Sequence, residues 1–165
     1  MTSEVLGSSS VARVRKALDD AGLASEIVEL PGAARTARAA AAFLGCDAAQ
    51  IANSLVFRGA TSGPPLLVMS SGARRVDLAR LAEIAGEPVS KADADFVRQS
   101  TGFAIGGVAP VGHVSPIRTF VEESLAAHAE IWAAAGHPHT VFRLTYADLL
   151  RITRGMAVRA ASAGN

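Results

Sequence analysis

The sequence is poor in cysteine, in lysine and in long apolar runs. Its 165 residues include one cysteine, Cys46, and two lysines, Lys16 and Lys91. A single cysteine cannot build a disulfide framework, which makes a reducing compartment the default for such a chain. No apolar run approaches the roughly 18 residues that a membrane span requires. The N-terminus also lacks the basic-then-apolar pattern of a signal peptide. We therefore expect a cytoplasmic protein without a membrane partner.

A strong charge of either sign is missing as well. The net charge is +1, so bulk electrostatics does not indicate a nucleic-acid-binding protein, and we expect no DNA partner. The excess of arginine over lysine suits bidentate contacts with phosphate, but it equally fits a GC-rich genome. Half of the residues are hydrophobic and 19% are charged, which is typical of a globular chain. The length predicts a single domain over residues 1–165.

Helix and strand patterns alternate irregularly along the chain. Caps and apolar periodicity predict helices after Ser9 or Ser10, over 37–44 after Thr36, and over 48–52, 77–85, 91–100, 122–135 and 146–152. Predicted strands cover 26–30, 53–58, 66–70, 117–121, 140–144 and 156–159, with a hairpin turn at 61–65. In the helix from Asp77, we expect Leu78, Leu81, Ile84 and Ala85 to face inward. Residues 1–9 and 160–165 are expected to be flexible ends. This order favours a mixed α/β or α+β domain around a mostly central sheet.

The most distinctive stretch is the glycine-rich segment Thr101–His113, with the sequence TGFAIGGVAPVGH. Glycine removes the side-chain wall, so that another molecule can approach the main chain closely. Pro110 fixes its own φ and stiffens the loop. A rigid loop that presents backbone N–H groups suits a carbonyl oxygen or an anion. The alternative is a tight connection between strands that happens to be rich in glycine.

Established catalytic and metal motifs are absent from the sequence. The histidines, His113, His128, His137 and His139, lack partners at metal-ligand spacing, so we expect no metal. We find no Walker A motif, dinucleotide fingerprint or nucleophile elbow. Asp47 follows Cys46 and disfavours a thiolate there. Asn53 and Ser54 open an apolar strand, where site residues are common, although Asn53 also fits a simple helix-to-strand cap.

Several blocks of the chain together resemble a known family. They are TARAAAAFLG (36–45), QIANSLVFR (50–58), Ser71-Gly72, Lys91-Ala92-Asp93, the TGFAIGGVAPVGH block and Ala135-Gly136-His137-Pro138. Their order and spacing resemble the YbaK/prolyl-tRNA-synthetase-associated editing domain family (INS-like, ProX), over about residues 11–159. The resemblance implies a compact mixed α/β domain with a curved, mostly antiparallel central sheet flanked by helices. It also implies a trans-editing aminoacyl-tRNA deacylase that needs no metal or organic cofactor.

The resemblance also implies a set of site residues. In the family, a Gly-x-x-x-Pro loop, here Gly106, Gly107, Val108, Ala109 and Pro110, holds the aminoacyl carbonyl through backbone N–H groups. Family members usually carry a lysine where this chain has Asn53, and an asparagine has no charge and a shorter reach. We count Gly106–Pro110 and Asn53 as the catalytic positions. The expected substrate-binding residues are Ser54, Ile51, Phe57, Thr36, Ser71, Gly72 and His137.

The expected substrate is the aminoacylated acceptor end of a tRNA related to tRNA(Pro), with an aminoacyl-tRNA synthetase as a further candidate partner. Ile51, Phe57 and Val108 would form a small apolar amino-acid pocket, and His137 would line its mouth. One alternative is a family member weakened or inactivated by Asn53, which binds aminoacyl-tRNA ends or a small ligand. Another is a hydrolase of an ester other than aminoacyl-tRNA. Arg58, Arg74 or Lys91 could replace the missing lysine charge if any of them reaches the pocket.

Overall fold

Five α-helices begin where the sequence supplies a polar cap. A computed structural model of the chain describes residues 3–162. The helices are α1 (Ser9–Asp20), α2 (Ala37–Leu44), α3 (Leu78–Ala85), α4 (Ala94–Thr101) and α5 (Tyr146–Thr153), with short 3-10 helices η1 (Ala48–Gln50) and η2 (Glu123–Ala127). Thr36, Asp77 and Thr145 cap α2, α3 and α5 as predicted. The side chain that caps α1 is Ser8, rather than Ser9 or Ser10.

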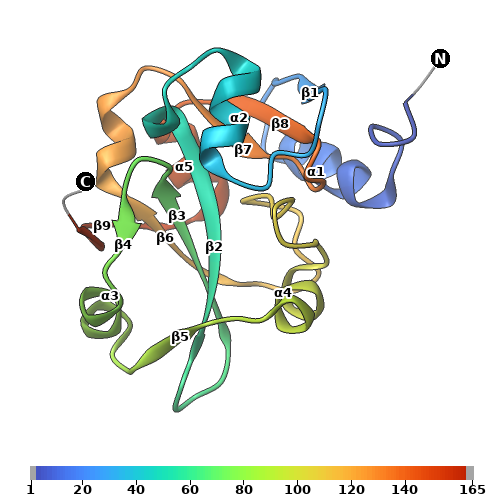
Figure 1. Ribbon diagram of the computed structural model, residues 1–165. Coiled ribbons are helices and arrows are strands. Elements are labelled where there is room, and N and C mark those ends of the chain that lie inside the picture. The colour runs from blue at the N-terminus through green and yellow to red at the C-terminus, as the bar shows by residue number, and fades with distance from the viewer. Residues whose placement is uncertain (1–2, 163–165) are drawn as a thin grey trace.

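One large mixed sheet forms the centre of the molecule (Figure 1). Its strands are β1 (Ile27–Glu29), β2 (Ile51–Gly59), β3 (Pro65–Ser71), β5 (Val89–Lys91), β6 (Arg118–Glu122), β7 (Ile131–Ala134), β8 (Thr140–Leu144) and β9 (Met156–Val158). They are ordered β1-β8-β7-β2-β3-β6-β9, and β5 pairs with β2. Pairing is mostly antiparallel, and the parallel pairs are β2 with β7, β3 with β6, and β6 with β9. The predicted fold class is therefore confirmed.

Strand β2 has two different neighbours along one of its edges. Its other edge pairs with β3 from Ala52 to Arg58. On the divided edge, β7 pairs with Ile51 and Ala52, whereas β5 pairs with residues 57–59. The sheet therefore divides beside residues 53–56, and we call this gap the fork.

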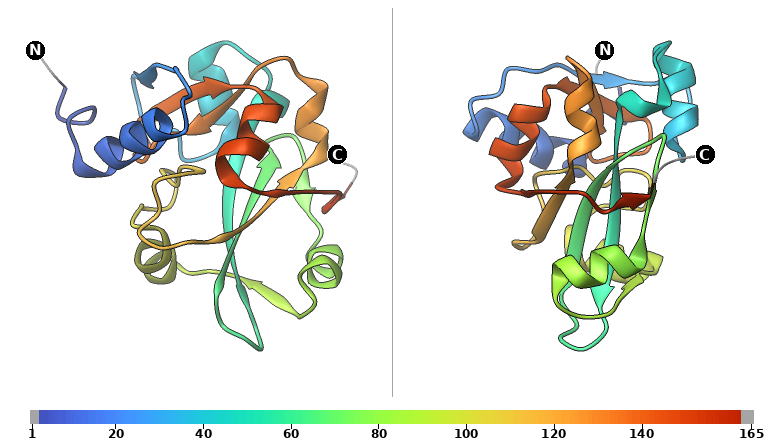
Figure 2. Two further views of the ribbon diagram at one scale, coloured as in Figure 1. Left: turned by 180° about the vertical axis from the view of Figure 1, so that it is seen from behind. Right: turned by 90° about the vertical axis from the view of Figure 1, so that its left-hand side faces the viewer.

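Helices cover both faces of the sheet (Figure 2). On one face, α1 and α5 contribute Val11, Val14, Leu18 and Leu149 to the main core, beside Val56, Leu67 and Met69 of the sheet. On the other face, Leu81 of α3 packs with Phe57, Leu66 and Phe120. Ala40 and Ala41 of α2 pack on Ile51. Within residues 3–162, no helix has the length and apolar character needed to cross a membrane.

The predicted helix over 122–135 is wrong. The chain forms η2 and then strand β7, in which Ile131 and Ala133 are buried between β2 and β8. The alanine-rich sequence favours a helix locally, but pairing on both edges of the sheet overrides that propensity.

Three smaller predictions about helices are also corrected. Leu78 of α3 does not face inward, because 47% of its surface is exposed. Lys91 lies in β5 opposite Phe57, so α4 begins only after its cap Asp93. The short helix from Ala48 ends at Gln50, because residue 51 already belongs to β2.

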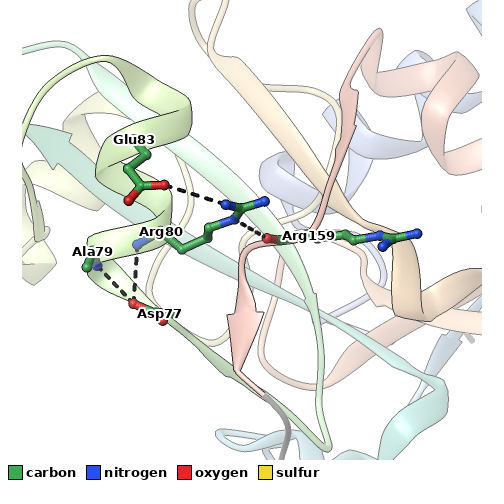
Figure 3. Close-up of polar contacts among 5 residues, drawn as sticks. All are labelled: Asp77, Ala79, Arg80, Glu83 and Arg159. Atoms are coloured by element: carbon green, nitrogen blue, oxygen red, sulfur yellow. Dashed lines mark hydrogen bonds and ion pairs between the residues drawn. The ribbon is translucent and has the colours of Figure 1, made fainter.

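The C-terminal segment is anchored as far as the structure describes it. Strand β10 (Ala161–Ser162) pairs with β4 (Arg75–Val76), so residues 160–162 are not a flexible end. The buried Glu122 carboxylate accepts hydrogen bonds from the N–H groups of Ala160 and Ala161, at 2.8 and 2.9 Å. Arg80 of α3 donates to the Arg159 carbonyl at 3.1 Å and pairs with Glu83, while Asp77 caps the helix (Figure 3). The expected flexibility of residues 1–2 and 163–165 lies outside the described residues.

Candidate active site

A cavity of about 420 Å³ lies at the fork of β2. Segments distant in the sequence meet around it. The main ones are residues 34–40 at the start of α2, residues 51–56 of β2, residues 105–108 of the glycine-rich loop, and residues 132–134 of β7. This volume is in the range of small-ligand sites. The structure therefore brings the glycine-rich loop and the Asn53 region together around one cavity, as the sequence predicts for a site.

The glycine-rich loop is held firmly at its start. The buried Thr101 hydroxyl donates to the Val97 carbonyl at 2.7 Å and accepts from the Phe103 N–H at 3.0 Å. The Phe103 ring is buried in the core, and the Arg13 guanidinium lies 5.0 Å from its centroid. Arg13 also donates to the carbonyl of Gly102 at 2.7 Å. These contacts fix the direction in which the loop leaves α4.

The middle of the loop packs directly on the backbone of a second segment, residues 137–138. A Cβ built on Gly107 would lie 2.8 Å from the Cα of His137, so only glycine fits there. Gly106 adopts a φ of +90°, a conformation that L side chains rarely tolerate. Pro138, the next residue of the packed segment, lines the cavity beside Gly106. The glycine pair thus serves a close backbone approach.

Several N–H groups of the loop have no protein acceptor within residues 3–162. Gly107 donates its N–H to the Ala104 carbonyl at 2.9 Å. Over residues 3–162, the N–H groups of Ile105, Gly106 and Val108 have no hydrogen-bond acceptor, and all three residues line the cavity. Fixed backbone donors beside a cavity are the arrangement that stabilises an oxyanion.

The last two residues of the Gly106–Pro110 motif lie behind the cavity. Ala109 and Pro110 are buried and do not line it. The Nε2 of His113 lies 2.8 Å from the Ala109 carbonyl, and because a carbonyl only accepts, Nε2 carries the hydrogen. Burial lowers the pKa of His113, the contact with Ala109 opposes this shift, and Arg13 adds to it. A neutral His113 thus supports the loop from behind.

Main-chain groups of β2 also point into the fork. Gly72 donates its N–H to the Ile51 carbonyl at 2.9 Å. The main-chain N–H and C=O groups of residue 51, and of every second residue after it, therefore point towards β3. The residues between them face the opposite way, and Val56 there accepts from the Ala92 N–H at 3.1 Å. Ser54 lies between the two ladders, and its N–H and C=O therefore face the gap. Its hydroxyl donates to the Met69 sulfur at 3.3 Å.

Asn53 lines the cavity, and its side-chain amide has no protein hydrogen-bond partner in the described part of the chain. Its cross-strand neighbour is Ser70, whose buried hydroxyl is also without a partner over residues 3–162. Asn53 is the third residue of β2, so it is not the cap at the strand's start. Its amide is therefore free to contact a ligand.

The other predicted substrate-binding residues are divided between the cavity and its surroundings. Ile51, Thr36 and Gly72 line the cavity, although the Thr36 hydroxyl is occupied in capping α2. Ser71 does not line it, because its hydroxyl donates to the Ala49 carbonyl and accepts from the Ala73 N–H.

Two of the predicted cavity residues are placed elsewhere. Phe57 lies further along β2, on the same face of the strand as Asn53. It packs with Leu66 and Leu81 under α3 and does not line the cavity. His137 lies behind Gly107, and its Nδ1 accepts from the His139 N–H at 3.1 Å. Burial and the neighbouring His139 lower the pKa of His137, and Glu29 opposes this shift. The expected roles of Phe57 and His137 in lining the pocket are therefore corrected.

Several residues of the cavity wall were not predicted. The cavity is also lined by Arg35, Arg38, Ile105 and Trp132. Lys91, one of the three cations considered as a replacement for the missing lysine, lines it as well. By contrast, Arg74 does not line it, and the Arg58 guanidinium lies 4.8 Å from the Phe96 ring centroid. Arginine near a helix N-terminus is electrostatically unfavourable, and this signal at α2 could have drawn attention to Arg35 and Arg38.

Other classes of site find no support in the described residues. Residues 3–162 contain no group of three histidine, cysteine or acidic side chains that could hold a metal ion. Burial and the adjacent Asp47 raise the pKa of Cys46, which disfavours its thiolate. The cavity wall, all of it within the described part, includes no aspartate or glutamate. No side chain of the wall is therefore an evident general base.

Comparison with known proteins identifies the family. Residues 32–152 match the family model of the aminoacyl-tRNA editing domain. A relative from Enterococcus faecalis, "Putative Cys-tRNA(Pro)/Cys-tRNA(Cys) deacylase EbsC", is 27% identical over 73% of this chain and 73% of its own length. The uncharacterized protein YwhH of Bacillus subtilis is 26% identical over 76% of this chain and 79% of its own length.

Solved structures agree with this family. The crystal structure of "a putative trans-editing enzyme for prolyl tRNA synthetase" has a TM-score of 0.88 and 40% identity, covering 94% of this chain and 99% of the other. The hypothetical protein APE2540 has a TM-score of 0.85 and 25% identity, covering 91% and 99%. The chain therefore belongs to the aminoacyl-tRNA editing domain family. Such domains act on aminoacyl-tRNA, and the deacylase relative is consistent with an aminoacyl-tRNA hydrolase.

Proposed function

We propose that this protein hydrolyses, in trans, the ester that joins a wrong amino acid to the terminal adenosine of a tRNA related to tRNA(Pro). The observation that carries the proposal is the cavity at the fork. Gly106 and Val108, whose N–H groups have no acceptor within residues 3–162, line it together with Asn53 and Ser54. The relatives described as a Cys-tRNA(Pro) deacylase and as a trans-editing enzyme for prolyl-tRNA synthetase support the choice of tRNA.

In the proposed reaction, the ester carbonyl oxygen accepts hydrogen bonds from the N–H groups of Gly106 and Val108. A water oxygen attacks the carbonyl carbon, the bond from carbon to the ribose oxygen breaks, and the ribose oxygen takes up a proton. The products are a free amino acid and an uncharged tRNA. Aminoacyl esters are reactive, so positioning and stabilisation of the oxyanion suffice without a side-chain base, and a ribose hydroxyl of the tRNA serves to activate the water.

The apolar part of the cavity wall favours a small amino acid. Ala92, Val97 and Val108 form an apolar part of the wall, and Ile51 lies on the side of α2. Asn53 and Ser54 would orient the adenosine or the amino group by hydrogen bonds. We further propose prolyl-tRNA synthetase as the partner that brings the substrate, and the cytoplasm, where tRNAs are charged, as the location.

A panel of mischarged tRNAs tests the proposal. We expect hydrolysis above the spontaneous rate for at least one small amino acid, such as cysteine or alanine, on tRNA(Pro), and no hydrolysis of correctly charged prolyl-tRNA. A family member with lysine at the position of Asn53 is the positive control. If that relative cleaves its substrate while this protein cleaves none of the panel, the proposed activity is wrong.

A further inference from the structure

Three cations surround the mouth of the cavity. Arg35, Arg38 and Lys91 line it, and all three are exposed. None of them forms an ion pair or a side-chain hydrogen bond with any residue of 3–162. Because the wall includes no carboxylate, the cavity carries uncompensated positive charge in a protein whose net charge is only +1.

The cations come from two sides of the fork. Arg35 and Arg38 flank the cap of α2, which lies over one end of β2, whereas Lys91 ends β5, which crosses the other end (Figure 1). All three residues line the same cavity, so the elements at both ends of the fork contribute positive charge to its wall. An elongated anion that passes between these elements would be in reach of both.

The backbone holds each wall in place. Ala34 donates its N–H to the Pro138 carbonyl at 2.8 Å, and the Cα of Arg35 lies 3.9 Å from a Cβ built on Gly106. The α2 cations are thus fixed next to the glycine-rich loop. Ala92 donates to the Val56 carbonyl at 3.1 Å, which fixes the neighbouring Lys91 at the fork.

Helix stability does not explain the α2 cations. Positive side chains at the N-terminus of a helix oppose its dipole, and the same helix end favours anions. Nor does Lys91 have an ion-pair partner within residues 3–162, and the carboxylate of Asp93, two residues further on, caps α4 by accepting from the Phe96 N–H. These positions gain from their charge only when an anion is bound.

We propose that Arg35, Arg38 and Lys91 form a phosphate subsite that holds the phosphodiesters leading to the terminal nucleotide of the substrate. This inference rests on the proposed function, because it assigns to the same cavity a substrate with a single-stranded RNA end. The subsite also accounts for the uncharged Asn53 on β2. The positive charge that a lysine would supply there comes instead from the residues that flank the fork. A neutral ester of similar size would not benefit from the subsite.

Binding of an uncharged RNA end tests the subsite without any hydrolysis. The probe is the trinucleotide CCA with a 5′-hydroxyl, compared with the same trinucleotide carrying neutral methylphosphonate linkages. We expect Arg35→Gln, Arg38→Gln and Lys91→Gln each to weaken binding of the charged probe by about five- to ten-fold at low salt. Each substitution should also reduce the slope of log K against log salt by about 0.7 per lost phosphate contact. The neutral probe should bind weakly and respond to none of them.

Matched controls separate this effect from a general loss of charge. Arg15 of α1 is exposed and does not line the cavity, so Arg15→Gln controls the arginine variants. Lys16→Gln controls Lys91→Gln, because these are the two lysines of the chain. Neither control should change binding more than two-fold, and unchanged thermal melting would show that all variants fold.

The outcomes distinguish the subsite from the deacylase activity. If the charged and neutral probes bind equally, or the cavity variants bind like their controls, the phosphate subsite is refuted whatever the deacylation assay shows. If binding of CCA depends on the three cations while no mischarged tRNA is cleaved, the subsite stands and the proposed activity falls. If both hold, the cavity variants should raise KM for the aminoacyl-tRNA with kcat nearly unchanged.

Discussion

Replacing Gly107 with alanine should abolish most of the activity while leaving the protein folded. The added Cβ would lie 2.8–2.9 Å from the N, Cα and C atoms of His137, about 0.6 Å short of an ordinary 3.4 Å contact. These are backbone atoms and cannot rotate away, so the loop or the residue 137 segment must move by at least that amount. Val108 follows directly, so its N–H, one of the two proposed oxyanion donors, moves with the loop.

A displacement of this size is large for catalysis and moderate for stability. Misplacement of a reacting group by about 1 Å costs on the order of 10²-fold in rate, and we expect a loss of 30- to 100-fold in kcat/KM, roughly in proportion. Overpacking of a buried site costs about 1–3 kcal/mol. The assay is deacylation of the mischarged tRNA that the wild-type protein cleaves best, together with urea unfolding of the same samples.

Gly86 offers a control for the loss of stability alone. It ends α3 with a φ of +83°, and a Cβ there would meet nothing within 4 Å. Gly86→Ala should therefore destabilise the protein by about 1 kcal/mol through backbone strain without affecting kcat/KM. If Gly107→Ala retains wild-type kcat/KM, or if Gly86→Ala loses as much activity as Gly107→Ala, the argument that the loop position determines catalysis is refuted.

Three further predictions concern other parts of the molecule. Asn53→Lys should lower KM by about five-fold, since a charge-assisted contact exceeds a neutral one by about 1 kcal/mol; activity that appears only in this variant would instead show that the wild-type site has lapsed. Glu122→Gln should lower the free energy of unfolding by about 1.5–3 kcal/mol, because its carboxylate accepts from the N–H groups of Ala160 and Ala161, and a denaturation midpoint equal to wild type would contradict this. The pKa of His113 is lowered in the folded protein, so the unfolded state binds more protons on acidification. Stability should therefore fall as the pH drops below about 6.5 towards the lowered pKa, and urea midpoints of His113→Asn should show a weaker pH dependence if His113 is the cause.

Local signals predicted the helices well and the strand β7 badly. Thr36, Asp77 and Thr145 each cap a helix because a side-chain oxygen reaches an N–H within the first turn, an interaction contained in a few residues. The conformation of residues 131–134 depends instead on pairing with β2 and β8, segments about 80 residues before and a few after it. No local pattern in an alanine-rich stretch indicates which distant strand it will pair with.

The site was predicted in part for the same reason. The glycine-rich loop is visible in sequence because the close approach to residue 137 and the φ of Gly106 demand glycine. The wall of the cavity is not visible, because it depends on which faces meet at the fork. The side chains of Phe57 and Asn53 lie on the same face of β2. Only the packing of Phe57 under α3 shows that it does not line the cavity. Arg35 and Arg38 line the cavity only because α2 packs on β2, which the sequence does not show.

The position of the charges changes the meaning of Asn53. On the sequence, a missing lysine on β2 suggests a weakened site, because the sequence does not show which other cation reaches the pocket. In the structure, Arg35, Arg38 and Lys91 line the same cavity that Asn53 lines. The groups proposed to act on the ester itself are main-chain N–H groups, which no side-chain substitution at residue 53 removes. Binding of the RNA end and stabilisation of the oxyanion are thus assigned to different elements, so substitutions of the wall cations should affect KM and substitutions of the glycine pair should affect kcat.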